Sequence, residues 1–144
     1  MQFNKINDAL SVAAQIGAED APAIAAAGFR AVICNRPDGE SPGQPESRRI
    51  EAAVRAAGLA FAYLPVISGA VADEQGEAFG ALLAELPGPV LAYCRSGTRC
   101  TALWSLSQAA AGREVEAILA DAAGAGYDMR GLAPRLDALA RNKG

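Results

Sequence analysis

A cysteine and an arginine separated by four residues form the segment most capable of chemistry. Cys94 ends the short apolar run Val90–Tyr93, the segment Arg95-Ser96-Gly97-Thr98 leads to Arg99, and an apolar helical pattern follows. A strand–loop–helix order presents backbone N–H groups and a helix N-terminus to a ligand. Positive charge and a helix N-terminus both favour a thiolate. The segment therefore predicts Cys94 as a nucleophile in an anion-binding loop, with Arg99 as a ligand of the anion.

The chain contains no histidine, which limits how such a thiolate is activated. A Cys–His dyad, a histidine general base and a histidine metal ligand are all excluded. We expect no metal and no cofactor, so positive charge and backbone dipoles alone must activate Cys94.

Composition restricts the class of protein and its partners. The chain has 144 residues, 51% hydrophobic and 20% charged, with a formal net charge of -3. It is long enough for one domain over residues 1–144, and its charge argues against binding nucleic acid or an anionic membrane. The longest uncharged stretch, 56–72, is short for a membrane span and contains Pro65 and Gly69. Three cysteines without framework spacing indicate free thiols, and we expect a cytoplasmic protein without a signal peptide.

Strand and helix patterns alternate along the chain. Apolar runs predict strands over 10–16, 29–35, 60–64 and 90–93, and periodic apolar residues predict helices over 22–27, 46–57, 73–86, 98–111, 114–123 and 132–140. This alternation predicts an α/β fold with a central, mostly parallel sheet flanked by helices on both faces.

Ligands of such sheets bind at the carboxyl ends of the strands. Three loops follow strands there, over 36–43, 65–72 and 94–99, and they carry Arg36, Arg95 and Arg99. We therefore expect an anionic substrate held by Arg99 and Arg36, with the backbone of Arg95, Ser96, Gly97 and Thr98 around it.

Three residues near this edge keep two interpretations each. Asp73 is either the N-cap of the helix that begins there, which we favour, or a general acid. Cys100 either packs in the core, again favoured, or acts as a resolving thiol for Cys94. Cys94 itself could be a buried strand-end cysteine, but the arginines and glycine after it favour a nucleophile. Cys34, between apolar strand residues, is expected in the core.

The segment Cys94–Arg99 resembles the loops of two enzyme families. In cysteine-dependent, dual-specificity phosphatases the loop has five residues between Cys and Arg, with His before the Cys and a hydroxyl residue after the Arg. Cys94 and Gly97 match that pattern, whereas Tyr93 replaces the His, Arg99 comes one residue early and Cys100 replaces the hydroxyl residue. In rhodanese-type sulfurtransferases the loop is one residue shorter and often begins Cys-Arg, as here.

A longer resemblance covers residues 1–112 most clearly. The segments 27–40, Tyr63-Leu64-Pro65-Val66 and 93–99 are similar to the beta-lactamase-hydrolase-like protein, phosphatase-like domain family. The resemblance implies a dual-specificity-phosphatase-like fold with the short loop. Members are also named sulfur transferases, and some are fused to a metallo-beta-lactamase-like persulfide dioxygenase.

These observations lead us to expect a sulfurtransferase. Cys94 would take the outer sulfur of thiosulfate or a low-molecular-weight persulfide and pass it to a thiol acceptor, with a persulfide dioxygenase as a partner. A shorter loop has one N–H donor fewer and suits a smaller group than a phosphate ester. The alternatives are a phosphatase with a phosphocysteine intermediate and Asp73 as acid, and an anion- or redox-sensing module without turnover.

Overall fold

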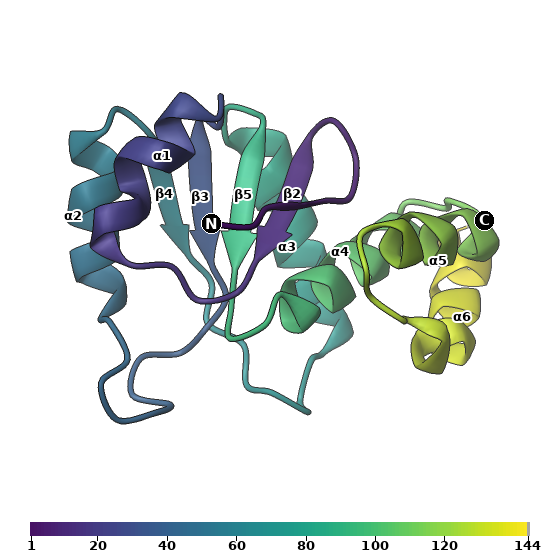
Figure 1. The fold of residues 1–144 in the computed structure, drawn as a ribbon. Helices are drawn as coiled ribbons and strands as arrows, with labels where there is room; N and C mark the ends of the chain where they lie inside the picture. Colours follow the sequence, from purple (N-terminus) through teal and green to yellow (C-terminus); the bar gives the residue numbers. More distant parts are fainter. Residues whose placement is uncertain (144) are drawn as a thin grey trace.

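The computed structural model describes residues 1–143, which fold around one five-stranded sheet (Figure 1). Its strands are β1 (Asn4–Lys5), β2 (Leu10–Ala13), β3 (Ala31–Cys34), β4 (Ala60–Tyr63) and β5 (Val90–Tyr93). Its α-helices are α1 (Ala21–Ala26), α2 (Ser47–Ala56), α3 (Asp73–Glu85), α4 (Thr98–Ala110), α5 (Val115–Gly124) and α6 (Ala133–Lys143). Short 3-10 turns, η1 (Ala18–Asp20) and η2 (Arg130–Leu132), precede α1 and α6. Each predicted helix and strand is present, within a few residues of its expected bounds.

The sheet has the strand order β1-β2-β5-β3-β4 and is parallel except for β1. The mostly parallel α/β fold is thus confirmed. The first predicted strand is shorter than expected, ending at Ala13, and β1 was not predicted. Two residues are too few to show an alternating pattern, and β1 exists because it pairs with β2, with Asn4 opposite Val12.

Helices cover both faces of the sheet because successive strand residues point to opposite sides. On β5, Leu91 and Tyr93 face α1 and α2, whereas Val90 and Ala92 face the side of α3 and α4. Helix α4 is buried almost all round, from Arg99 to Leu106, because α5 and α6 pack on its outer side. This burial fixes the start of α4, which is where the cysteine loop ends.

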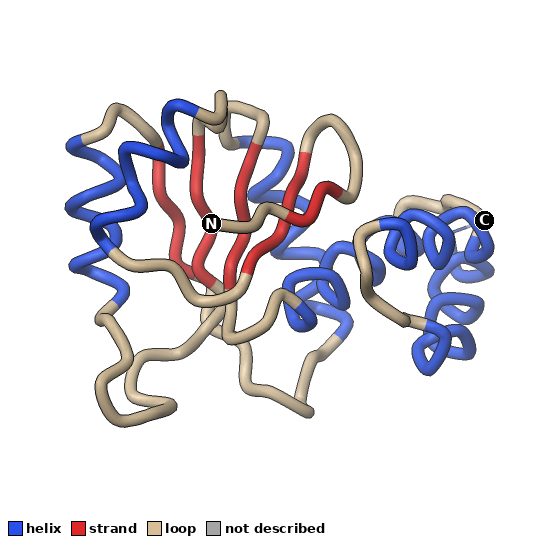
Figure 2. The backbone as a smooth tube through the Cα atoms, in the orientation of Figure 1, coloured by secondary structure: helices blue, strands red, loops and turns tan. Residues whose placement is uncertain are grey.

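The long connections lie together at the carboxyl ends of the parallel strands (Figure 2). They are the segments after β3 and after β4, and the short loop between β5 and α4 lies at the same edge, as the sequence predicted. None of the helices described in residues 1–143 is both long and apolar enough to cross a membrane.

Candidate active site

The cysteine loop occupies residues 94–97, between the end of β5 and the first residue of α4. Gly97 is the N-cap of α4 and has φ +92°, a left-handed conformation that side chains rarely adopt. A Cβ at Gly97 would also collide with the hydroxyl of Tyr127. Glycine is therefore required here both by the turn and by a close neighbour.

Cys94 lies at the floor of this loop with 1% of its surface exposed. The Gly97 N–H donates to Cys94 Sγ at 3.1 Å. The pKa of Cys94 falls from 9.0 to about 5, chiefly because the Cys100 thiol donates a hydrogen bond to it. Burial opposes this shift, and the backbone N–H groups of Cys100, Ser96 and Gly97 add to it. Cys94 is therefore a thiolate at neutral pH, without any histidine.

Cys100 supports that thiolate from the first turn of α4. It is completely buried, and its pKa rises well above 9.0 because of burial first and the hydrogen bond to Cys94 second. Cys100 thus stays protonated and remains a donor. It packs in the core, as favoured, and also contacts Cys94 directly; the three cysteines are free thiols. Cys34 lies in the core beneath α1 and α2, as predicted.

Arg99 is buried, with its guanidinium fixed by Glu40 and by the backbone of the loop after β4. Its Nη1 donates to Glu40 Oε2 at 2.7 Å and to the Val66 carbonyl at 2.8 Å, and its Nη2 donates to Glu40 Oε1 at 2.9 Å. These bonds leave the edge formed by Nε and the second Nη2 proton without an acceptor among residues 1–143. That edge is a rigid pair of donors suited to two oxygens of one anion.

Glu40 belongs to this site, although the sequence did not indicate it. Its carboxylate joins Arg99 and Arg36, and the hydrogen bonds from Arg99 are the main reason why its pKa lies below the ordinary value. The signal available in the sequence was an acid four residues after Arg36, in a loop expected at the same sheet edge as Arg99.

Arg36 was expected to hold substrate, but in the structure its guanidinium donates hydrogen bonds to three side chains of the protein. Its Nε donates to Glu40, its Nη1 to Gln15 Oε1 at 3.1 Å and its Nη2 to Ser41 Oγ at 2.8 Å. Its side chain is 6% exposed. The geometry places Arg36 behind Glu40, where it orders the loop after β3.

The remaining loop residues contribute mainly their backbone. The Arg95 side chain is exposed and has no partner in residues 1–143, while its carbonyl accepts the Gln15 N–H at 3.3 Å. Ser96 and Thr98 are exposed and their hydroxyls lie 3.0 Å apart. Of these loop residues, Ser96 and Gly97 direct their backbone N–H groups at Cys94.

Asp73 was expected to be the N-cap of α3, and this prediction is wrong. The N-cap is Ala72, whose N–H is capped by the Gln75 side chain at 2.8 Å. Asp73 Oδ1 instead accepts a hydrogen bond from Arg135 Nη2 on α6 at 2.6 Å. Sequence reasoning missed this because Arg135 lies 62 residues away and meets Asp73 only through the packing of α6.

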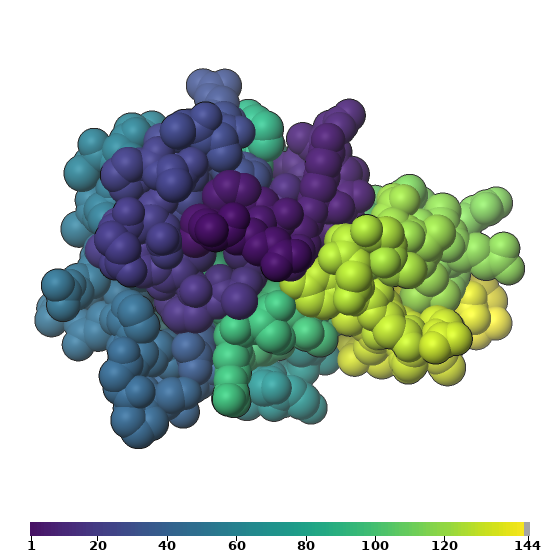
Figure 3. Space-filling model, viewed as in Figure 1, coloured from purple at the N-terminus to yellow at the C-terminus, as the bar shows by residue number. Residues whose placement is uncertain are grey.

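Tyr127, in the connection between α5 and η2, is a second residue that the sequence did not indicate. Its hydroxyl donates to the Ser96 carbonyl at 2.9 Å and accepts from Asn4 Nδ2 at 2.8 Å. The N-terminal residues accordingly lie against the segment between α5 and α6 (Figure 3). Among residues 1–143, three or more His, Cys, Asp or Glu side chains nowhere form a group that could hold a metal.

Comparison with known proteins identifies the family of the chain. The family model described as Beta-lactamase hydrolase-like protein, phosphatase-like domain, matches residues 2–111. A Beta-lactamase hydrolase-like protein of Agrobacterium fabrum is 39% identical over 113 residues, which are 78% of this chain and 26% of the relative. The chain thus spans about a quarter of that curated relative's length.

Solved structures support the same assignment. A candidate phosphatase from Neisseria meningitidis aligns with a TM-score of 0.84 and 37% identity, over 94% of this chain and 96% of the other. Tk-PTP in its active form aligns with a TM-score of 0.73 over 96% of both chains, at 17% identity, which bears on the fold alone. The chain therefore has the fold of cysteine-dependent phosphatases and belongs to the phosphatase-like domain family of Beta-lactamase hydrolase-like proteins.

Proposed function

We propose that this chain is a cysteine-dependent phosphatase that hydrolyses phosphate monoesters through a phosphocysteine at Cys94. The observation that carries the proposal is the unpartnered Nε–Nη2 edge of Arg99, held in place by Glu40 beside the thiolate. The family description and the Neisseria meningitidis relative favour phosphoryl transfer over the sulfur transfer that we expected from the sequence.

The proposed reaction has two chemical steps. Two phosphate oxygens accept from Nε and Nη2 of Arg99, and loop N–H groups bind around the ester. The Cys94 thiolate attacks phosphorus, so that an S–P bond forms and the bond from phosphorus to the leaving oxygen breaks. Water then attacks phosphorus, releases inorganic phosphate and returns Cys94 as a thiolate, with one proton passing to solvent.

A phosphatase normally uses an acid to protonate the leaving oxygen, and the carboxylates near this site have other partners. The three carboxylates nearest the sheet edge in sequence are all engaged: Glu40 with two arginines, Asp73 with Arg135, and Asp38 with the N–H and hydroxyl of Ser47. With these three carboxylates engaged, none of them is free to protonate the leaving oxygen, and the first step expels an oxyanion. We therefore infer that the substrates are esters with good leaving groups, such as aryl phosphates.

Sulfur transfer is the second candidate, and the same engaged carboxylates favour it. Attack of Cys94 on the outer sulfur of thiosulfate forms a persulfide and releases sulfite, which needs no proton. A thiol acceptor then takes the outer sulfur, and a persulfide dioxygenase is the partner that would consume the product. The four-residue spacing between Cys94 and Arg99 also favours this smaller donor.

Either reaction requires reduced cysteines, and we propose a cytoplasmic location on that ground.

Intact-protein mass spectrometry after rapid acid quench distinguishes the two. A phosphoryl adduct formed from p-nitrophenyl phosphate and absent in Cys94→Ser supports the phosphatase. A gain of one sulfur atom from thiosulfate or glutathione persulfide, without phosphate release from aryl phosphates, would replace it by sulfur transfer. Tight binding of sulfate or phosphate with neither adduct would instead indicate a sensing module.

The role of Asp73 is tested by the leaving group. Because Asp73 is paired with Arg135, Asp73→Asn should hydrolyse p-nitrophenyl phosphate at nearly the wild-type rate, and alkyl phosphates should be poor substrates of both proteins. If Asp73→Asn instead hydrolyses alkyl phosphates at least tenfold more slowly than the wild type, and aryl phosphates at the same rate, then Asp73 is the general acid.

A further inference from the structure

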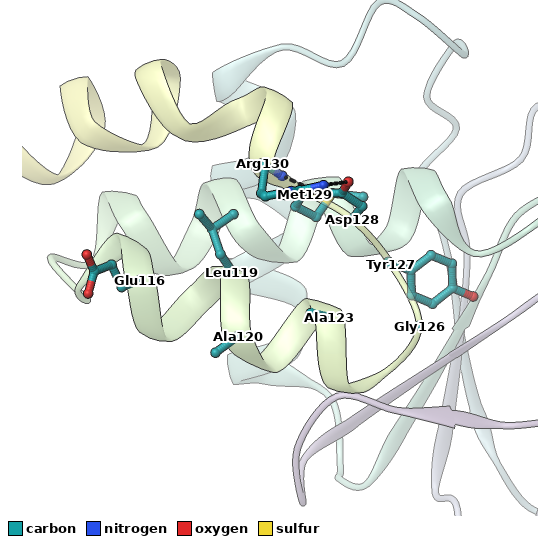
Figure 4. A pocket seen from close by; sticks show the side chains of 9 residues that line it. All are labelled: Glu116, Leu119, Ala120, Ala123, Gly126, Tyr127, Asp128, Met129 and Arg130. Carbon is teal, nitrogen blue, oxygen red and sulfur yellow. Dashed lines mark hydrogen bonds and ion pairs between the residues drawn. The ribbon is translucent and has the colours of Figure 1, made fainter.

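Tyr127 lies outside the segment that the family model matches, yet it contacts the cysteine loop directly. Its ring forms one wall of a surface hollow between α5 and η2, and its hydroxyl points away from that hollow toward the sheet (Figure 4). The hydroxyl is thus directed at the loop, with one bond donated to the Ser96 carbonyl and one accepted from Asn4.

The Ser96 carbonyl and the Gly97 N–H belong to one peptide unit. A peptide is planar and trans, so its C=O and N–H point in opposite directions and rotate together. On one side of this peptide the carbonyl accepts from Tyr127 at 2.9 Å, and on the other side the N–H donates to Cys94 Sγ at 3.1 Å. Fixing the carbonyl therefore fixes the direction of the N–H.

We propose that Tyr127 is a positioning residue that holds the Ser96–Gly97 peptide with its N–H on the Cys94 thiolate. The absence of a side chain at Gly97 allows the hydroxyl to approach this closely, since a Cβ would occupy its place. A hydrogen bond to the carbonyl also polarises the peptide and strengthens the N–H as a donor. The C-terminal helical region thereby contributes to thiolate activation without touching the reacting atoms.

Several other groups face Cys94 and remain unchanged in the test. Cys100 and Arg99 come from α4, Cys34 comes from β3, and Glu40 reaches the site through its ion pair with Arg99. Burial raises the pKa of Tyr127, so its hydroxyl stays protonated and able to donate throughout the acidic and neutral range.

Tyr127→Phe removes the hydroxyl alone. The test measures Cys94 ionisation by the pH dependence of iodoacetamide alkylation, mapped by peptide mass, and by ultraviolet absorbance of the thiolate. We expect the midpoint for Cys94, about 5 in the wild type, to rise by about 0.5–1 unit, which corresponds to about a 3- to 10-fold loss of thiolate on the acidic limb. Asn4→Ala, which removes the other partner of the hydroxyl, should shift the midpoint in the same direction by less.

Tyr63→Phe is the matched control, because the Tyr63 hydroxyl accepts from the Asp38 N–H in a different loop. It should leave the midpoint unchanged. A wild-type midpoint in Tyr127→Phe, with unchanged circular dichroism, would overturn the proposal. Alkylation and absorbance need no substrate, so the outcome does not depend on whether the protein transfers phosphate or sulfur.

Discussion

Replacing Glu40 by glutamine tests whether this carboxylate holds the arginine of the site. Glu40 accepts three N–H bonds of 2.7–2.9 Å from Arg99 and Arg36, whose side chains are 8% and 6% exposed. Removing one partner of a buried ion pair costs about 3–5 kcal/mol. The side chain of Glu40 is 24% exposed and glutamine keeps one acceptor, so we expect Glu40→Gln to lower the free energy of unfolding by about 2–3 kcal/mol.

Urea unfolding at pH 7 measures this loss. Trp104, the single tryptophan, is buried and reports unfolding by its fluorescence. Glu51→Gln is the matched control, because Glu51 pairs with Arg55 at 2.9 Å on the exposed surface of α2 and should contribute less than about 1 kcal/mol.

Acidification gives a second signature of the same contact. The pKa of Glu40 is lower in the folded than in the unfolded protein, where the ordinary value is 4.5. Its contribution is therefore present above the unfolded pKa and is lost as pH falls through the folded pKa. The difference between wild type and Glu40→Gln should shrink below about pH 4.5. The reasoning is refuted if Glu40→Gln unfolds within about 0.5 kcal/mol of the wild type at pH 7, or loses no more than Glu51→Gln.

Three other perturbations follow from the site. Cys100→Ala removes the main hydrogen bond to the thiolate and should raise the pKa of Cys94 from about 5 by about 1–2 units, measured by pH-dependent alkylation; an unchanged midpoint would contradict the assigned cause. Hydrogen peroxide tests the role of Cys100: because this thiol is completely buried and stays protonated, we expect sulfenic and sulfinic acid at Cys94 rather than a disulfide, and a Cys94–Cys100 peptide on non-reducing mapping would instead show a resolving role. Arg99→Lys should lose at least about 100-fold in kcat/KM, because a lysine lacks the paired donors. Arg36→Lys should lower stability and lose less than about threefold in kcat/KM, and equal losses in the two variants would show that Arg36 also binds substrate.

The sequence alone determined the order of the helices and of the four parallel strands, and it predicts Cys94 as the nucleophile. Apolar runs and periodic helices are local patterns, and the strand–loop–helix order around Cys94 is contiguous in the chain, so both are visible without a structure. Gly97 and Arg99 follow from the same short segment.

Tertiary structure decided which side chains remain available to a substrate. In the sequence, Arg36 and Arg99 are equal candidates for holding the anion, because both follow strands at the same sheet edge. In the structure, Glu40 and Gln15 bind the guanidinium of Arg36, whereas Arg99 keeps its Nε–Nη2 edge without an acceptor among residues 1–143. Asp73 is paired by a residue on α6, and Tyr127 reaches the loop from a segment 31 residues away from Ser96. These partners are distant in the chain and meet only when the helices pack. Buried polar groups are nearly always hydrogen-bonded, and the fold decides which partner lies close enough. The low pKa of Cys94 depends on both the local sequence and the tertiary structure. The loop N–H groups come from the local sequence, whereas the burial of Cys100, whose thiol donates to Cys94, is a property of the folded core.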